Sequence, residues 1–206
     1  MAAEIGAERS IVFDATSEKA VNDAVAQVAD DGSLDILLCS HGILTQSSAV
    51  DMPVDQWRET IDIDQWRETI DIDLISVLLP NRTALRPMLA QESVRIINVA
   101  SQLGIKGVVS LAHYAAAKAG VIAMTKSIAL ETAAKGVLVH AIAPGPIQTP
   151  MVADIDDDWK RAKRAQLPLT AGSDCQRRSL PQRCCAPRIR GEICSSDRSS
   201  APTRAT

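Results

Sequence analysis

Four short apolar runs recur along this chain, and each is rich in β-branched or aliphatic side chains. They lie at residues 10–13, 34–38, 94–100 and 137–142. Runs of this length and composition are typical of strands buried in a parallel sheet. The pattern therefore predicts four strands, each followed by a polar residue or a turn.

Helical patterns fill two of the intervals between these strands. After Thr16 or Ser17, either of which can cap a helix, apolar residues recur at i, i+3, i+4 and i+7 until the chain reaches Gly32. The apolar positions are Val21, Ala24, Val25 and Val28. A second helix is predicted for the alanine-rich segment 112–134, because alanine has the highest helix propensity.

One polar set stands out against this pattern. Ser101 follows the third predicted strand, Tyr114 comes thirteen residues later, and Lys118 lies four residues after the tyrosine on the same helix face. A tyrosine hydroxyl titrates near 10, so it is a poor base at neutral pH unless a neighbouring positive charge favours the phenolate. Lys118 supplies that charge, and the Ser101 hydroxyl can hydrogen-bond a substrate oxygen. The set predicts a proton-transfer site at the carboxyl edge of the sheet.

These three residues resemble the catalytic set of the short-chain dehydrogenase/reductase family. The segment 144–150, PGPIQTP, is similar to the family's turn that contacts the nicotinamide carboxamide, although an ordinary turn after a strand explains it equally well. The resemblance implies that Ile147 would bind through its backbone and Thr149 through its hydroxyl. It also implies a Rossmann-like, doubly wound α/β sheet and NAD or NADP as the cofactor.

Two further positions are cofactor-binding candidates by the same resemblance. The turn Cys39-Ser40-His41-Gly42 takes the place of the family's usual Asn-Asn-Ala-Gly, which packs beside the cofactor, and only Gly42 is unchanged. His41 is either a catalytic base or, as its place in a turn favours, a histidine with a structural polar partner. Asp14 resembles the family's acidic residue at the adenine, but a carboxylate at a helix entry would occupy the same position.

A nine-residue segment, DQWRETIDI, occurs twice in succession, at 55–63 and 64–72. Nine residues make about two and a half helical turns, so the copies would turn their apolar stripes to opposite sides of one helix. One copy is therefore predicted to bulge out or to extend the helix into solvent. The first copy has the family's usual spacing from Gly42, and the second copy has its usual spacing to the active-site asparagine.

Asp73 stands where the family has its active-site asparagine, which holds a water on the proton route. Asp64 has the same place relative to the first copy, but Asp73 keeps the usual distance to Ser101 and is the preferred candidate. An ionised aspartate cannot donate hydrogen bonds, and its charge would oppose the effect of Lys118 on Tyr114. Lower activity is the expected consequence.

Some features of the family have no counterpart in this sequence. The glycine-rich turn that holds the cofactor pyrophosphate at a helix N-terminus is missing. We expect an incomplete sheet without its first two strands and its last one, with an exposed apolar edge at 34–38. Residues 1–168 are predicted to form a partial dinucleotide-binding domain. From residue 169 the composition shifts to Arg, Cys, Ser and Pro, which predicts a disordered tail over 169–206.

Bulk properties exclude several other functions. A net charge of -3 and five aromatic residues give no basis for binding nucleic acid or an anionic membrane surface. No apolar run is long enough to span a bilayer, and the first residues lack the features of a signal peptide, so a cytoplasmic protein is expected. Four cysteines lie in the tail without C-x-x-C spacing, so no metal site is predicted. They are Cys175, Cys184, Cys185 and Cys194.

The resemblance implies an NAD(P)-dependent oxidoreductase that interconverts an alcohol and a ketone or aldehyde, with a small-molecule substrate. The family commonly associates through helices that correspond to 64–90 and 112–134, so a homo-oligomer is compatible with the resemblance. The second hypothesis is a catalytically inactive fragment, at most an interaction partner of an intact relative, and the missing phosphate loop favours it for the chain as written. The sequence specifies neither the substrate nor the choice between NAD and NADP.

Overall fold

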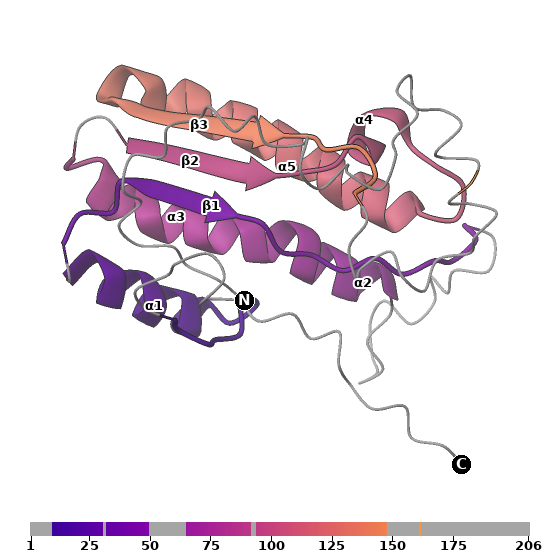
Figure 1. Cartoon of the computed structure of the whole chain (residues 1–206), viewed down its shortest axis with the longest axis horizontal. Coiled ribbons are helices and arrows are strands. Elements are labelled where there is room, and N and C mark those ends of the chain that lie inside the picture. The colour runs from indigo at the N-terminus through magenta and orange to yellow at the C-terminus, as the bar shows by residue number, and fades with distance from the viewer. Residues whose placement is uncertain (1–9, 31, 50–64, 92–93, 148–160, 162–206) are drawn as a thin grey trace, which may run out of the picture.

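A computed structural model gives the fold of residues 10–30, 32–49, 65–91, 94–147 and 161. This part of the chain contains a parallel sheet of three strands in the order β1-β2-β3 (Figure 1). The strands are β1 (Ile36–Cys39), β2 (Val94–Val99) and β3 (Val137–Ile142). Helices connect these parallel strands, so the fold is of the α/β class, as the sequence predicts, and the sheet is incomplete.

Helices link the strands. In chain order they are α1 (Glu18–Asp30), α2 (Gln65–Ile70), the π-helical turn η2 (Asp71–Ile75), α3 (Ser76–Met88), α4 (Leu103–Lys106), α5 (Ala112–Thr132) and the 3-10 turn η3 (Ala133–Lys135). The first π-turn residue follows α2 directly, so α2, η2 and α3 form one continuous helical segment before β2. The long helix α5 and η3 then connect β2 to β3.

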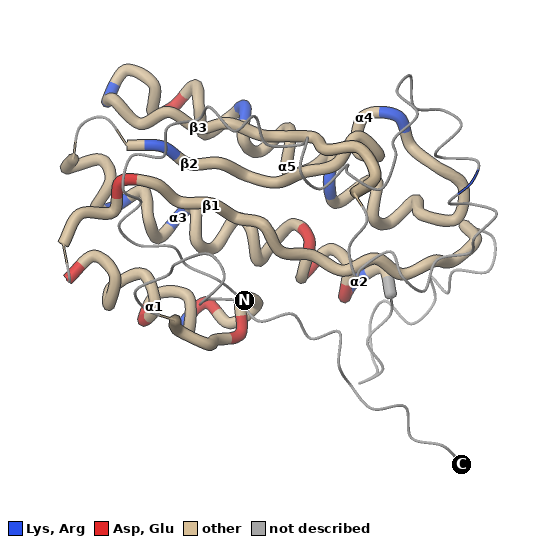
Figure 2. The backbone as a smooth tube through the Cα atoms, in the orientation of Figure 1, with Lys and Arg blue, Asp and Glu red and all other residues tan. Residues whose placement is uncertain are grey.

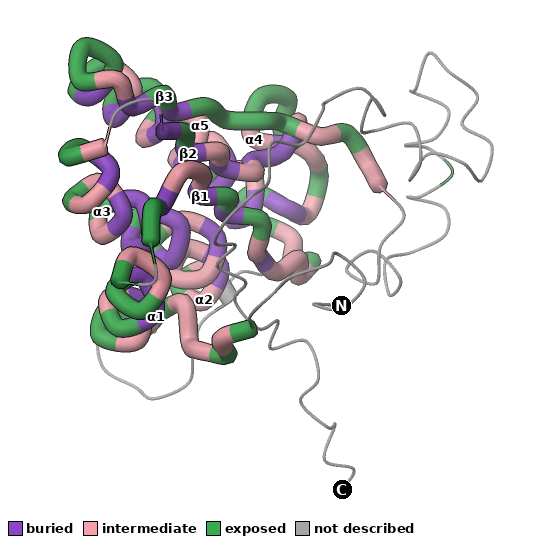
Figure 3. The backbone as a smooth tube through the Cα atoms, turned by 60° about the vertical axis from the view of Figure 1, so that its left-hand side comes forward, coloured by how far each residue is buried: buried purple, intermediate pink, exposed green. Residues whose placement is uncertain are grey.

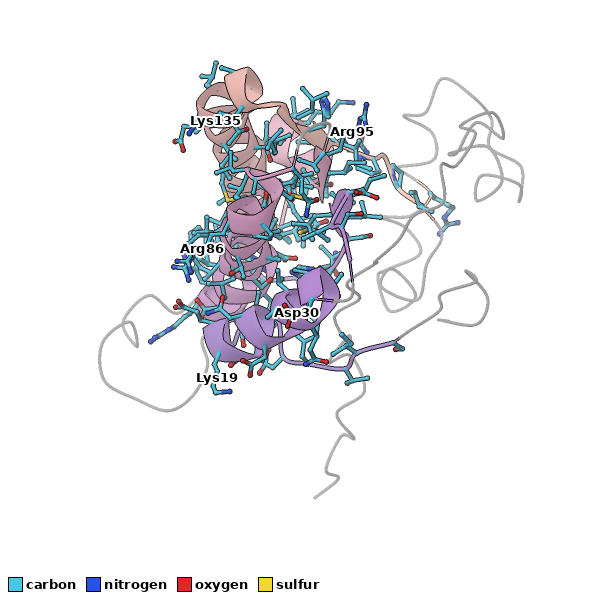
Figure 4. All side chains as sticks on the ribbon, turned by 90° about the vertical axis from the view of Figure 1, so that its left-hand side faces the viewer. Lys19, Asp30, Arg86, Arg95 and Lys135 are labelled. Atoms are coloured by element: carbon cyan, nitrogen blue, oxygen red, sulfur yellow. The ribbon has the colours of Figure 1, made fainter. Side chains whose placement is uncertain are left out.

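Helices α1, α3 and α5 lie on one side of the sheet, as the side view in Figure 4 shows. Strand residues that point toward them, such as Leu37 and Ile96, are fully or nearly fully buried. Alternate residues point the other way, and there Leu38 is 41% and Leu138 is 42% exposed (Figure 3). Within the described residues, helices therefore cover the sheet on one face only.

A polar network runs through the core between the sheet and the helices. Asn98 on β2 exchanges two hydrogen bonds with Asn81 on α3, at 2.8 and 3.0 Å. The same Asn98 amide donates to Thr125 Oγ1 on α5 at 3.1 Å. Because these buried amides have partners, the network joins the central strand to both flanking helices without leaving a polar group unpaired between them.

The beginning of α1 and the end of α5 follow from local side-chain chemistry. Ser17 Oγ accepts a bond from the Ala20 amide at 3.4 Å, which makes Ser17 rather than Thr16 the capping residue. At the other end, Gly136 has a φ of 77°, a left-handed conformation that glycine adopts without strain. This glycine stops the helix, and β3 begins at the next residue.

The first predicted strand is wrong: residues 10–13 are not in a strand. No strand among the described residues lies beside them to pair with, and Val12 is 79% exposed, so their β-branched composition is not enough by itself. Phe13 instead packs on the hydrophobic core. The other three strands and both helices are confirmed, with β1 beginning at Ile36. The one-turn helix α4 lies between Ser101 and α5.

The second copy of the repeat is part of the continuous helix. From residue 65 it forms α2 and enters η2, where the Ser76 amide bonds to the carbonyls of Asp71 and Leu74. An α-helix would direct this amide to Ile72 instead, so the turn is wider than an α-helical one. The first copy (55–63), Asp64 and the tail with its four cysteines lie outside the described residues.

Charged residues of both signs are distributed over the helices of the described part of the chain (Figure 2). None of its helices has the length and apolar composition needed to cross a membrane.

Candidate active site

Polar side chains from four elements meet beyond the carboxyl ends of the strands. Ser101 follows β2, Asp73 lies in η2, and Tyr114 and Lys118 lie one turn apart near the start of α5. The turn after β1 supplies His41 and Gly42. Because the carboxyl ends of parallel strands share one edge of the sheet, residues far apart in the sequence come together here.

The Ser101 hydroxyl lies close enough to the Tyr114 phenol to lower its pKa. Each residue is 9% exposed, so the pair lies just inside the surface of the described part. Ser101 Oγ also accepts a bond from the Leu103 amide at 3.2 Å, which fixes the serine at the entry of α4. Leu103 and Leu111 pack with the tyrosine ring. This pair has the arrangement needed to hold one substrate oxygen between two hydroxyls.

Lys118 is held by a carboxylate. Its Nζ lies 3.1 Å from Asp73 Oδ1, donates to the His41 carbonyl at 3.4 Å, and lies 5.7 Å from the centre of the Tyr114 ring. Asp73 Oδ1 also accepts a bond from the Ile43 amide at 3.1 Å. Asp73 Oδ2 is buried and has no hydrogen-bond partner among the described residues.

The burial of this carboxylate sets the electrostatics of the site. Burial raises the pKa of Asp73 to about 6, and the opposite charge of Lys118 limits the rise. Burial, and then the charge of Asp73, raise the pKa of Tyr114 to about 12, against the lowering effect of the Ser101 hydrogen bond. The phenol is therefore protonated at neutral pH. The charge of Asp73 therefore disfavours the phenolate.

Gly42 allows the turn after β1 to approach this ion pair. A Cβ at this position would lie 2.1 Å from Asp73 Oδ1 and 3.0 Å from Lys118 Nζ. Such distances are shorter than atoms can approach, so any side chain would displace the carboxylate. Gly42 is the one residue of this turn that matches the family's, and the closeness of Asp73 and Lys118 explains why a glycine is needed there.

His41 has the polar partner that its turn position favours. Its Nε2 lies 2.5 Å from Ser76 Oγ at the beginning of α3. Burial, together with the positive charge of Lys118, lowers the pKa of His41 to about 4, so the imidazole is neutral at physiological pH. The structural interpretation of this histidine agrees with the geometry.

The remaining cofactor candidates are Asp14, Cys39, Ile147 and Thr149. Asp14 Oδ1 accepts bonds from the Thr16 amide at 3.0 Å and the Thr16 hydroxyl at 2.6 Å, which agrees with the helix-entry interpretation. The Cys39 thiol is buried in the core near Asn81, where burial raises its pKa to about 12. Cys39 can therefore meet a ligand only through its backbone. Ile147 is partly buried, and Thr149 lies outside the described residues.

Sequence reasoning missed His113, the residue before the tyrosine. It is fully buried, and its Nε2 lies 3.1 Å from both the hydroxyl and the carbonyl oxygen of Thr45. Its ring lies 6.4 Å from that of Trp66 in α2. The signal was its spacing, since His113, Ala117 and Val121 recur every four residues along the buried face of α5.

The match to a protein-family model gives the class of this chain. The model of the short chain dehydrogenase family matches residues 1–160. This match covers most of the chain, and the geometry of Ser101, Tyr114 and Lys118 lies within it. The chain belongs to the short-chain dehydrogenase family.

Individual relatives share more than a third of the aligned residues. The 3-oxoacyl-acyl-carrier-protein reductase FabG of Rickettsia bellii is 37% identical over 157 residues, which are 76% of this chain and 60% of the relative. The cis-4-hydroxycyclohexanecarboxylate dehydrogenase of Sinomonas cyclohexanicum is 38% identical over 162 residues, covering 78% and 61%. The chain thus spans about three fifths of the length of the relatives that it matches.

A solved structure has the same fold. A chain described as a short-chain dehydrogenase/reductase from Burkholderia xenovorans superposes with a TM-score of 0.66 at 32% identity. The match covers 77% of this chain and 58% of that one. The three-stranded sheet is therefore part of the larger Rossmann-like sheet of this family.

Proposed function

We propose that this chain carries the proton-transfer residues of an NAD(P)-dependent oxidoreductase that interconverts an alcohol and a ketone or aldehyde. The observation that supports the proposal is the meeting of three groups from different elements. The Ser101 hydroxyl lies close enough to the Tyr114 phenol to lower its pKa, and the Lys118 ammonium lies 5.7 Å from the centre of the same ring. Family membership supports the same reaction class.

Each residue has a separate task in this proposal. Ser101 holds the substrate oxygen by a hydrogen bond, and Tyr114 donates its proton to that oxygen or accepts it in the reverse direction. Lys118 favours the phenolate and would hold the ribose hydroxyls. The nicotinamide, when bound, supplies or accepts the hydride.

The described residues fit a nicotinamide cofactor in part. The buried Asp73 Oδ2 lacks a donor among them, so it can accept a bond from a hydroxyl, either of water or of a ribose. The Lys118 ammonium contacts the other oxygen of the Asp73 carboxylate, so it could bind the same hydroxyl. Ile147 and Thr149 remain the proposed contacts to the carboxamide, and Asp14 the proposed contact to the adenine.

A second candidate function is that of a catalytically inactive relative, at most an interaction partner of an intact one. The observation that favours it is the ion pair between Lys118 and Asp73, together with the pKa of about 12 for Tyr114. A lysine neutralised by a buried carboxylate lowers the tyrosine pKa less than a free one does.

Binding of NADH and NADPH to the purified full-length chain distinguishes the two candidates. The measurement is a fluorescence titration of each dinucleotide, with circular dichroism to verify that the chain is folded. Saturable binding that Lys118→Ala weakens at least tenfold supports the oxidoreductase. The control is Lys126→Ala, because Lys126 is an exposed lysine on the same helix and should not affect binding.

Tyr114→Phe completes the design. It removes the hydroxyl that transfers the proton but leaves the ring in its packing, so dinucleotide binding should persist while turnover of any alcohol or carbonyl substrate is lost. A folded chain that binds neither dinucleotide would overturn the oxidoreductase proposal and leave the inactive relative. Relatives named for acyl-carrier-protein, cyclohexane and sugar-acid substrates indicate how broad the first screen must be.

A further inference from the structure

One contact at this site has no part in the proposed proton transfer. His41, on the turn after β1, reaches Ser76, the first residue of α3, with 2.5 Å between Nε2 and Oγ. The two residues flank the ion pair of Asp73 and Lys118. The family turn that this segment resembles has alanine where this chain has His41, so the contact is a property of this chain.

A count of hydrogens fixes the direction of the contact. The Ser76 hydroxyl also lies within hydrogen-bond distance of the Ile72 carbonyl oxygen. A carbonyl has no hydrogen to give, so the single hydroxyl hydrogen of Ser76 must point toward it. Ser76 Oγ then accepts from His41, whose Nε2 carries the proton. The low pKa of His41, about 4, keeps the ring neutral in this tautomer.

The receiving carbonyl belongs to the π-helical turn. In η2 the Ser76 amide bonds to the carbonyls of Asp71 and Leu74, whereas an α-helix would pair it with Ile72. The Ser76 hydroxyl takes the place of this displaced amide at the Ile72 carbonyl. His41, Ser76 and Ile72 thus form a chain of two hydrogen bonds that stabilises the widened turn.

We infer that His41 is a positioning residue, which acts through Ser76 to keep the π-helical turn in the shape that presents Asp73 to Lys118. The same loop also holds Asp73 directly, because the Ile43 amide donates to Asp73 Oδ1 at 3.1 Å. Residues 41–43 therefore make two contacts with this helical segment, one to Ser76 and one to the Asp73 carboxylate.

This inference concerns the site of the proposed function, but it does not depend on cofactor binding. The groups that face the Asp73 carboxyl are Lys118 from α5, the Ile43 amide from the loop, and the Tyr114 phenol, whose pKa is raised by the charge of Asp73. The readout is the titration midpoint of this carboxyl in the cofactor-free chain, measured by NMR with carbon-13 at the aspartate carboxyls. Asp73→Asn assigns the signal.

His41→Ala should move the midpoint from about 6 toward the ordinary value of 3.8, because a relaxed turn lets water reach the carboxyl. His41→Gln should keep the midpoint near its wild-type value, since the glutamine NH2 group can take the place of Nε2–H at Ser76. His41→Asn has the same amide on a shorter side chain and should resemble His41→Ala. A midpoint that stays the same in both His41→Ala and His41→Asn overturns the inference.

Ser76→Ala tests the other end of the contact. It should shift the midpoint as His41→Ala does, and the double variant should shift it no further than either single change, since both break one chain of bonds. Additive shifts would show that the two residues act separately and would overturn the inference. If His41→Ala does not fold, the comparison of His41→Gln with His41→Asn decides alone. Failure of dinucleotide binding would leave all these outcomes unchanged.

Discussion

Asp73 and Lys118 form a buried ion pair, with 3.1 Å between Oδ1 and Nζ and side chains that are 0% and 4% exposed. The lysine that would lower the pKa of Tyr114 is thus held by a carboxylate that raises it. With its pKa near 12, the phenol keeps its proton at neutral pH. In this protonated state the phenol has a proton to donate to a carbonyl oxygen, whereas it must first lose that proton before it can accept one from an alcohol.

Asp73→Asn is expected to lower the pKa of Tyr114, because it removes the negative charge that opposes the phenolate. Tyr114 is the only tyrosine of the chain, so the near-ultraviolet absorbance of tyrosinate reports this residue alone. The ionised fraction at about pH 10.5 should rise severalfold, which corresponds to a shift of roughly one unit.

A matched control lies in the same turn. Asp71 is about half exposed and pairs with Arg67 at 3.9 Å, away from the phenol. Asp71→Asn removes the same charge from a solvated position and should leave the titration of Tyr114 unchanged. Equal titration curves for Asp73→Asn and wild type would falsify the electrostatic opposition.

The raised pKa of Asp73 also makes stability depend on pH. A carboxyl that titrates near 6 when folded and 3.8 when unfolded favours folding in its protonated form, so its contribution is greatest below pH 3.8 and is lost as the pH rises through 6. The full difference is about 3 kcal/mol. Urea denaturation between about pH 4 and pH 7 should therefore show a steeper loss of unfolding free energy in wild type than in Asp73→Asn. Parallel curves for the two proteins would contradict the assignment.

Gly42→Ala should destabilise the chain, because its Cβ would lie 2.1 Å from Asp73 Oδ1 and force the carboxylate away from Lys118 and the Ile43 amide. The expected loss of unfolding free energy is about 1–3 kcal/mol, as for other overpacked sites. Gly145→Ala is the control, since a Cβ there has no neighbour nearer than 3.8 Å. Chemical denaturation of both variants measures the difference, and equal stabilities would contradict the close approach.

The sequence predicted those parts of the fold that depend on local pattern. The strands at 94–100 and 137–142 and the helix at 112–134 have strong periodicity or propensity, and they formed as predicted. Residues 10–13 also have strand composition, but a strand needs a neighbour, and composition does not say whether one is present. Whether residues 10–13 form a strand therefore depends on long-range pairing, which their composition does not specify.

The candidate site shows the same division. The spacing of Ser101, Tyr114 and Lys118 located the site, because a helix face and a strand end are set locally. The hydrogen bond from His41 to Ser76 and the ion pair of Lys118 with Asp73 both join segments more than thirty residues apart. No periodicity in the sequence encodes such contacts, so they became visible only when the elements were packed.

The repeat gives the last prediction. Deletion of residues 55–63 yields the same chain as deletion of 64–72, since the two copies are identical. In the described fold one copy suffices: Trp66 lies near His113, Thr69 is buried, and the helix continues into the turn that carries Asp73. A connection shortened by nine residues changes the entropy of loop closure by less than about 1 kcal/mol. The deletion should therefore leave the unfolding free energy and the Tyr114 titration nearly unchanged.

Two substitutions in the full chain test which copy the fold uses. Trp66→Phe removes the indole that packs near His113 and should lower the unfolding free energy by roughly 1–2 kcal/mol, whereas Trp57→Phe should have little effect. Tryptophan emission and urea denaturation measure both. Equal losses for the two variants, or a marked destabilisation by the deletion, would mean that both copies contribute to the fold. Unequal losses in the expected direction would mean that the site was built from the second copy and that the first is surplus.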